Sequence, residues 1–97
     1  MITLVNLFDV HGVPERFEEA FEQVSAWIRD RPGFREHRLC RSPEDPSTYV
    51  NIAVWESEES LRAALAAPGF QERVAALRPL ARAHPHICTT VLTATVA

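Results

Sequence analysis

The chain has 97 residues, of which 46% are hydrophobic and 24% are charged, and its formal net charge is −3. This size and composition predict one globular domain, residues 1–97, and the slight negative charge gives no indication of a nucleic-acid or membrane surface. All ten basic residues are arginines, which excludes chemistry through a lysine Schiff base.

The N-terminal part of the chain predicts a strand, a helix and a second strand. Residues 2–9 are an uninterrupted β-prone run with two largely apolar faces, which is typical of a strand. Pro14 suits the first position of a helix, in which Phe17, Phe21 and others recur at helical spacing until the Pro-Gly pair of "DRPGF". Residues 34–41 then predict a second, more polar strand near an edge of the sheet.

The C-terminal part predicts a third strand, an interrupted helix and a fourth strand. Residues 48–56 form a β-prone run, and Ser57 is a suitable N-cap for the helix that follows it. The Pro-Gly pair of "APGF" interrupts that helix, and a second helical piece continues as far as Pro79. Residues 84–96 are rich in β-branched side chains and predict the final strand.

The order β-α-β-β-α-β predicts an α+β protein with the ferredoxin-like arrangement, an antiparallel sheet covered by helices on one face. Side chains alternate along a strand, so Asn51 and Trp55 share one face of the third strand while Val50, Ile52 and Val54 share the other. A sheet covered on one side only should alternate apolar and polar residues, and this one does not. We therefore predict a homodimer that packs sheet to sheet, with Asn51 and Trp55 directed toward the helices.

A small-molecule pocket between the sheet and the helices is the functional interpretation of this face. The small Ala53 leaves room between Asn51 and Trp55, and apolar pockets with a few polar groups are the usual form of small-molecule sites. The structural alternative is a tryptophan that only packs in the core and an asparagine that holds a loop. The aromatic candidates for the lining are Phe8, Phe21, Trp27 and Phe70.

His37 is the candidate general base, because an unperturbed imidazole titrates near neutral pH. The alternative is an edge-strand histidine that lies in solvent. His84 and His86 form an H-x-H pair, but no third ligand is evident and we expect no metal site. Cys40 and Cys88 have no metal-type spacing, and we expect both to be reduced, buried thiols.

No sequence motif indicates a cofactor or a membrane. Phosphate-binding glycine loops and the common metalloprotease and hydrolase motifs are absent. No apolar run approaches the ~18 residues that a spanning helix needs. We therefore expect a cytoplasmic protein that uses no nucleotide, flavin or metal and binds neither membrane nor nucleic acid.

Three segments carry a resemblance to a known family: "RPGF" after the amphipathic helix, "YVNIAVWESEESL", and the later "PGF". Together they resemble the antibiotic biosynthesis monooxygenase family, and the resemblance extends over nearly the whole chain. It implies a dimeric α+β barrel, in which two ferredoxin-like subunits are joined through their sheets. This fold agrees with the homodimer predicted from the two apolar faces of the strands.

One branch of that family oxidises phenolic polyketide intermediates such as anthrones to quinones, with O2 and without a cofactor. In that branch an asparagine and a tryptophan of the third strand, spaced like Asn51 and Trp55, belong to the active site. The resemblance therefore implies a cofactor-independent monooxygenase of secondary-metabolite biosynthesis, acting on an aromatic substrate and O2. The alternative is a non-oxidative small-molecule-binding or cyclase-like pathway protein with the same fold.

Other site positions of the family are matched only in part. Leu39 stands where some quinone-forming members carry a tyrosine of the site, and Leu61 stands where another tyrosine is found. A further branch degrades haem with a first-strand asparagine, which Asn6 resembles, but Val74 stands at the position of its iron-binding histidine. Haem degradation is therefore the less favoured alternative. The candidate substrate-binding residues are Asn6, Phe8, Phe21, Trp27, Leu39, Leu61, Phe70 and Val74.

Overall fold

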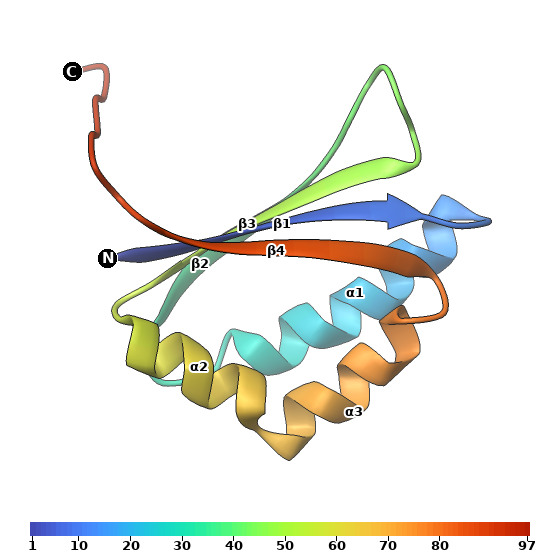
Figure 1. Cartoon of the computed structure of the whole chain (residues 1–97), viewed down its shortest axis with the longest axis horizontal. Coiled ribbons are helices and arrows are strands. Elements are labelled where there is room, and N and C mark those ends of the chain that lie inside the picture. Colours follow the sequence, from blue (N-terminus) through green and yellow to red (C-terminus); the bar gives the residue numbers. More distant parts are fainter.

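The four predicted strands pair into one antiparallel sheet in the computed structural model, which describes residues 1–97. The strands are β1 (Ile2–Val10), β2 (Phe34–Arg41), β3 (Thr48–Trp55) and β4 (Ala81–Thr89), in the spatial order β2-β3-β1-β4. All helices cover the same face of this sheet (Figure 1). The predicted α+β, ferredoxin-like arrangement is confirmed.

Three helices form the second layer: α1 (Pro14–Ile28), α2 (Glu58–Ala66) and α3 (Pro68–Leu77). Proline occupies the first turn of α1 and of α3, where its missing N–H costs nothing. The residue before Pro68 is extended, with ψ 141°, because proline disfavours the helical conformation of its predecessor. The predicted interruption therefore divides the second helical region into α2 and α3.

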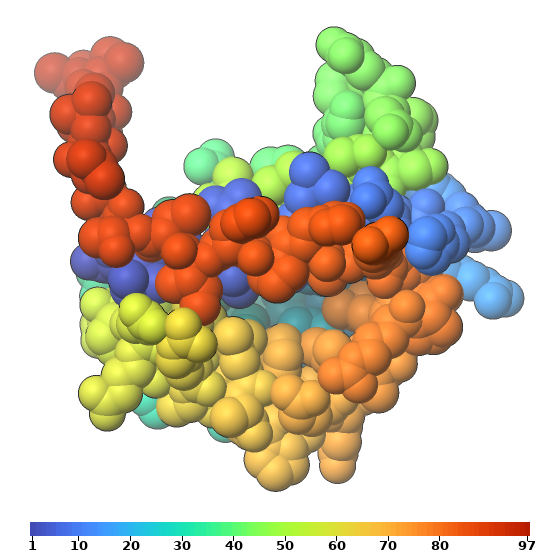
Figure 2. Space-filling model, in the orientation of Figure 1, coloured from blue at the N-terminus to red at the C-terminus, as the bar shows by residue number.

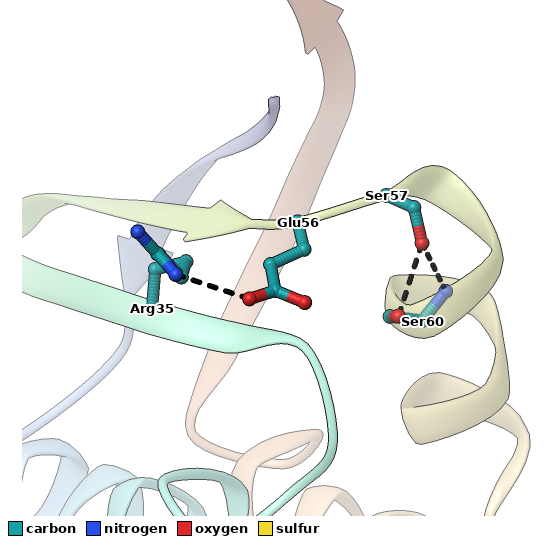
Figure 3. A network of polar contacts seen from close by, with 4 residues as sticks. All are labelled: Arg35, Glu56, Ser57 and Ser60. Atoms are coloured by element: carbon teal, nitrogen blue, oxygen red, sulfur yellow. Dashed lines mark hydrogen bonds and ion pairs between the residues drawn. The ribbon is translucent and has the colours of Figure 1, made fainter.

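Polar contacts surround the junction between β3 and α2 (Figure 3). The Oγ of Ser57 accepts a hydrogen bond from the backbone N–H of Ser60, as expected for an N-cap. Arg35 of β2 pairs with Glu56 at 3.0 Å. Gly33 has φ 82°, and a side chain there would collide with Ser60. These contacts fix the C-terminal end of β3, where Trp55 lies.

The predicted final strand, residues 84–96, is shifted in the structure. β4 begins at Ala81 opposite Val10 and ends at Thr89 opposite Ile2, so its length is set by that of β1. Beyond Thr89 no backbone partner remains. The C-terminal segment leaves the sheet on the side away from the helices (Figures 1 and 2). Three of its side chains are almost fully exposed, namely Val91, Leu92 and Val96.

The core that lies between the sheet and the helices consists of two clusters, which a pair of asparagines separates. Asn6 lies directly opposite Asn51 in the β1–β3 ladder. On the same face, this pair is flanked by the Leu4–Ala53 pair and the Phe8–Tyr49 pair. Each flanking pair belongs to a different cluster. The larger cluster contains Phe8, Val10, Phe17, Phe21, Val24, Tyr49, Leu77 and Ala81. The smaller cluster contains Leu4, Ala53, Trp55, Leu61 and Ala64.

The face of the sheet away from the helices is uncovered in the single chain (Figure 1). We call it the outer face; at its centre lie the partly exposed side chains of Val5, Leu7, Val50, Ile52 and Val54. The expectation of buried thiols is wrong for this chain, because Cys40 and Cys88 are free but exposed. Both stand on edge strands, opposite Val50 and Thr3. None of the helices is long and apolar enough to cross a membrane.

Candidate active site

A cavity of about 280 Å³ lies between the sheet and the helix layer, and most of its lining is hydrophobic. Figure 2 shows a hollow between β4 and α3. The β4 residues that line the cavity are Ala81, Ala83 and Pro85. These side chains are too short to close the gap between the strand and α3. The small residues at these three positions are the sequence signal of this opening.

Three buried polar groups lie in this apolar lining, on Asn6, Asn51 and Trp55. Strand alternation places all three on the helix side of the sheet, as predicted for Asn51 and Trp55, which are 8% and 0% exposed. The Nε1 of Trp55 and the Oδ1 of Asn6 are buried without a hydrogen-bond partner. An unpaired buried polar atom costs about 1–3 kcal/mol, so neither atom stabilises the fold through a hydrogen bond within the protein.

His37 bridges α1 and β3 across the floor of the cavity. Its Nδ1 lies 3.0 Å from Asn51 Oδ1, and its Nε2 lies 2.7 Å from Ser25 Oγ. An amide oxygen can only accept, so Nδ1–H donates to Asn51. In the neutral ring Nε2 then accepts a hydrogen bond from the hydroxyl of Ser25. The alternative of a histidine in solvent is therefore wrong, and both amide hydrogens of Asn51 remain free to donate elsewhere.

A β-bulge brings an additional aromatic ring to the site. The β2–β3 register shifts between Phe34 and Glu36, which places Phe34 opposite Trp55 and on the same face as His37. The rings of Phe34 and Trp55 meet edge to face with centroids 5.3 Å apart. Strict alternation along β2 assigns residues 34 and 37 to opposite faces, so the sequence alone did not identify Phe34.

Five of the candidate substrate-binding residues line the cavity. Phe8 and Asn6 come from β1, Phe21 from α1, and Phe70 and Val74 from α3. The helical members share the face of α1 or α3 that is turned to the sheet. They surround the polar groups with apolar surface, and such a lining can hold a planar aromatic ligand and exclude water.

The other three candidates, Trp27, Leu39 and Leu61, do not line this cavity. The indole of Trp27 packs on Gly69 of α3, and the guanidinium of Arg31 lies 4.5 Å from its ring. Leu61 is 0% exposed within the smaller cluster, and Leu39 packs against the larger one. All three face the interior as predicted, but neighbouring side chains separate them from the open space.

The lining also includes two polar residues that the sequence analysis did not single out: Gln71 of α3, and Arg78, which directly follows that helix. Arg78 is the only arginine, lysine or acidic residue that lines the cavity. Its Nη2 donates to Gln71 Oε1 at 3.3 Å, and Gln71 in turn donates to the backbone oxygen of Leu65 at 2.7 Å. Arg78 and Gln71 are exposed, so they lie at the solvent side of the cavity.

The remaining polar clusters lie outside the cavity. His84 pairs with Asp9 at 3.0 Å, and no group of three or more potential metal ligands is gathered anywhere in the chain. Tyr49 donates its hydroxyl to Glu18, and Arg41 lies near both. Burial, followed by the hydrogen bond to Glu18, raises the pKa of Tyr49 to about 12.

Comparison with known proteins places this geometry in context. The sequence model of the antibiotic biosynthesis monooxygenase family matches residues 1–76. Deoxynogalonate monooxygenase of Streptomyces nogalater is 46% identical over 79 residues, which cover 81% of this chain and 67% of that protein. A 42.8 kDa protein of the whiE locus of Streptomyces coelicolor is 32% identical over 58% of this chain, a stretch that spans only 14% of that protein.

A solved structure agrees over almost the full length. The crystal structure of SnoaB, a cofactor-independent oxygenase from Streptomyces nogalater, superposes with a TM-score of 0.92. The two sequences are 41% identical, and the alignment covers 95% of this chain and 94% of SnoaB. At this identity the likeness extends beyond a shared fold.

Proposed function

Because the chain belongs to the antibiotic biosynthesis monooxygenase family, we propose that it is a cofactor-independent monooxygenase that oxidises a phenolic or anthrone-type polyketide intermediate with O2 in secondary-metabolite biosynthesis. The observation that carries the proposal is the buried, unpartnered Nε1 of Trp55, which lines the same apolar cavity as Asn51. The likeness to a cofactor-independent oxygenase supports it.

The chemistry requires an electron-rich substrate anion rather than a metal or flavin. An anthrone first loses a proton from carbon, and its carbanion gives one electron to O2. The resulting radicals combine into a carbon–oxygen bond, and the peroxide anion accepts a proton. The hydroperoxide then loses water, with the second hydrogen of the same carbon, and leaves the quinone carbonyl. The protein must stabilise the anion and exclude water, which an apolar cavity with a few donors can do.

Trp55 and Asn51 are the proposed donors to the substrate oxyanion. The Nε1–H of Trp55 has no partner in the protein, and the Nδ2 hydrogens of Asn51 are not used by His37. A preorganised donor of this type contributes about 3 kcal/mol to transition-state stabilisation. Asn6 lies directly opposite Asn51 and its free Oδ1 can accept a phenol hydrogen of the substrate.

The test is quinone formation from dithranol, a hydroxylated anthrone, followed by absorbance under air and under argon. We expect O2-dependent formation above the rate in buffer, and a fall of about 10²-fold in Trp55→Phe. Trp27→Phe is the matched control, because it removes the indole that lies outside the cavity. An unchanged rate in Trp55→Phe would contradict the assignment of this donor.

We also infer that two copies associate through their outer faces. The centre of that face is aliphatic on both β1 and β3, while the flanking edge strands present Arg38, Glu36 and His86. An apolar centre with a polar rim is the usual anatomy of a protein interface. A dimer of this kind would also bury the exposed thiols of the edge strands.

The non-oxidative alternative is separated by the same experiment. Leu39 and Leu61 supply no hydroxyl to the cavity, which favours a protein that binds or cyclises an aromatic ligand without oxidising it. Such a protein would raise its melting temperature with dithranol under argon but consume no O2 under air. For haem degradation, α3 offers Val74 and no histidine as an iron ligand.

A further inference from the structure

The proposed oxidation begins with the removal of a proton, and the cavity contains a chain of three side chains that fits this task. We propose that Ser25 accepts the acidic proton of the bound substrate while it passes its own hydroxyl proton to Nε2 of His37, with Asn51 stabilising the imidazolium. This inference rests on the proposed function and assigns a proton path to the same site.

The path crosses three elements of the fold at hydrogen-bond distance. Ser25 Oγ on α1 is 2.7 Å from His37 Nε2 on β2, and His37 Nδ1 is 3.0 Å from Asn51 Oδ1 on β3. Ser25 follows Phe21 by one helical turn, so both side chains share the face of α1 that lines the cavity. The His37 ring is packed between Phe21 and Phe34, with centroids 5.9 and 6.0 Å away.

The direction of the proton transfer follows from the acceptor at the far end. Asn51 Oδ1 holds the ring proton of His37 on Nδ1, so the lone pair of Nε2 points to Ser25. Because Ser25 occupies Nε2, a substrate proton reaches the imidazole only through the serine hydroxyl. A similar order occurs in nucleophilic triads, in which a hydroxyl or thiol contacts an imidazole that a carboxylate or amide orients. Here it would carry a proton instead of forming an acyl bond.

The step balances without a further reactant. The substrate C–H bond breaks, its electron pair stays on the substrate, and an O–H bond forms on Ser25. The original O–H bond of Ser25 breaks as Nε2–H forms on His37. After O2 has been added, the imidazolium returns its proton through Ser25 to the peroxide anion. The protein is then restored before water is lost.

No other group in the lining offers a comparable base. The cavity is lined by no aspartate, glutamate, lysine, cysteine or tyrosine. Arg78 also lines the cavity, but a guanidinium has only N–H donors and no acceptor atom, so it offers no base. The Ser25–His37 pair is therefore the one neutral acid–base couple that a bound substrate can reach.

The test separates deprotonation from oxidation by working under argon. Dithranol is mixed rapidly with the protein, and its coloured anion is followed by absorbance. We expect Ser25→Ala and His37→Gln each to slow anion formation by about 10²-fold, the usual contribution of a positioned acid–base group. The double variant should be no slower than either single variant, because the two side chains act as one unit.

Two control variants make the result specific. Ser25→Thr keeps the hydroxyl and should restore most of the rate that Ser25→Ala loses. Ser47→Ala removes a serine hydroxyl from the exposed loop between β2 and β3 and should leave the rate unchanged. Thermal unfolding of each variant checks that it is folded, and Ser25→Ala should be, since alanine is favourable within a helix.

The outcomes under argon and under air are independent. A normal rate of anion formation in Ser25→Ala would overturn the relay, even if quinone still forms under air. A slow His37→Gln with a normal Ser25→Ala would also overturn it, because the imidazole would then act directly. Anion formation that depends on both residues under argon, without O2 uptake under air, would support the relay and contradict the proposed oxygenase.

Discussion

The two faces of the sheet differ in a way that reverses the ordinary distribution of polar and apolar residues. On the helix side, Asn6 and Asn51 form a polar pair inside a largely apolar cavity. On the outer face, the neighbouring pair of the same two strands is Val5 and Ile52, and both remain partly exposed in the single chain. Buried polar and exposed apolar groups are the informative exceptions, and they point to a ligand on one face and a partner on the other.

Neighbouring residues of one strand belong to the cavity and to the outer face. Asn51 and Ile52 are adjacent in β3, and alternation alone directs one to the cavity and the other to the outer face. A shift of the strand by one residue would exchange them. Two buried pairs stabilise the register that keeps the amides inside. They are Leu4 with Ala53 on one side of the asparagines and Phe8 with Tyr49 on the other.

The largest expected effect comes from placing a charge on the outer face. Ile52→Arg should leave a monomer, because an unpaired charge enclosed between two sheets costs several kcal/mol. Sedimentation or light scattering measures the change in mass. Ile87→Arg is the matched control, since Ile87 is 37% exposed and lies on the helix side of β4, opposite Leu4. A wild-type mass for Ile52→Arg would contradict assembly through this face.

A smaller effect, on the free energy of unfolding, should appear at alkaline pH through Tyr49 on the helix side of the sheet. The pKa of Tyr49 is raised from 10.0 to about 12, so the folded state favours the neutral phenol more strongly than the unfolded state does. Its stabilising contribution is complete below pH 10.0 and is lost as the pH rises through about 12. We expect the free energy of unfolding to fall by about 1–3 kcal/mol across this range.

The composition of the chain makes that measurement unusually direct. It contains one tyrosine and no lysine, so no other phenol and no ammonium side chain titrates in the same window. Urea unfolding across this pH range should therefore show a slope that Tyr49→Phe removes. The same slope in Tyr49→Phe would assign the effect to another group.

The smallest expected effect is a difference in the free energy of unfolding between variants of the two asparagines. Asn6→Leu should raise the free energy of unfolding by about 1 kcal/mol, because it removes a buried oxygen that has no partner. Asn51→Leu should lower it, because His37 Nδ1–H would lose its acceptor. Thermal or chemical unfolding measures both variants. Destabilisation of similar size in both would show that the two asparagines are equally satisfied in the folded protein.

Local sequence determined the order of the elements and the face that each side chain of β3 occupies. Hydrophobic periodicity, Pro14 at the start of α1 and Ser57 at the start of α2 were sufficient to order the strands and helices. The two-residue period of β3 was sufficient to direct Asn51 and Trp55 to the helix side. These features depend on neighbours within a few residues, which is why they can be read from one sequence.

Only the tertiary structure decided which side chains meet. Ser25 and His37 lie on different elements and become a pair through the packing of α1 on the sheet. The bulge before Glu36 changes the alternation of β2 and places Phe34 on the helix side. Gly69 leaves space on α3 in which the indole of Trp27 packs, outside the cavity. The end of β4 was set by the length of β1 rather than by its own β-branched residues. Alternation fixes a face, but the partners across it depend on register, bulges and helix packing, which arise from contacts between distant segments.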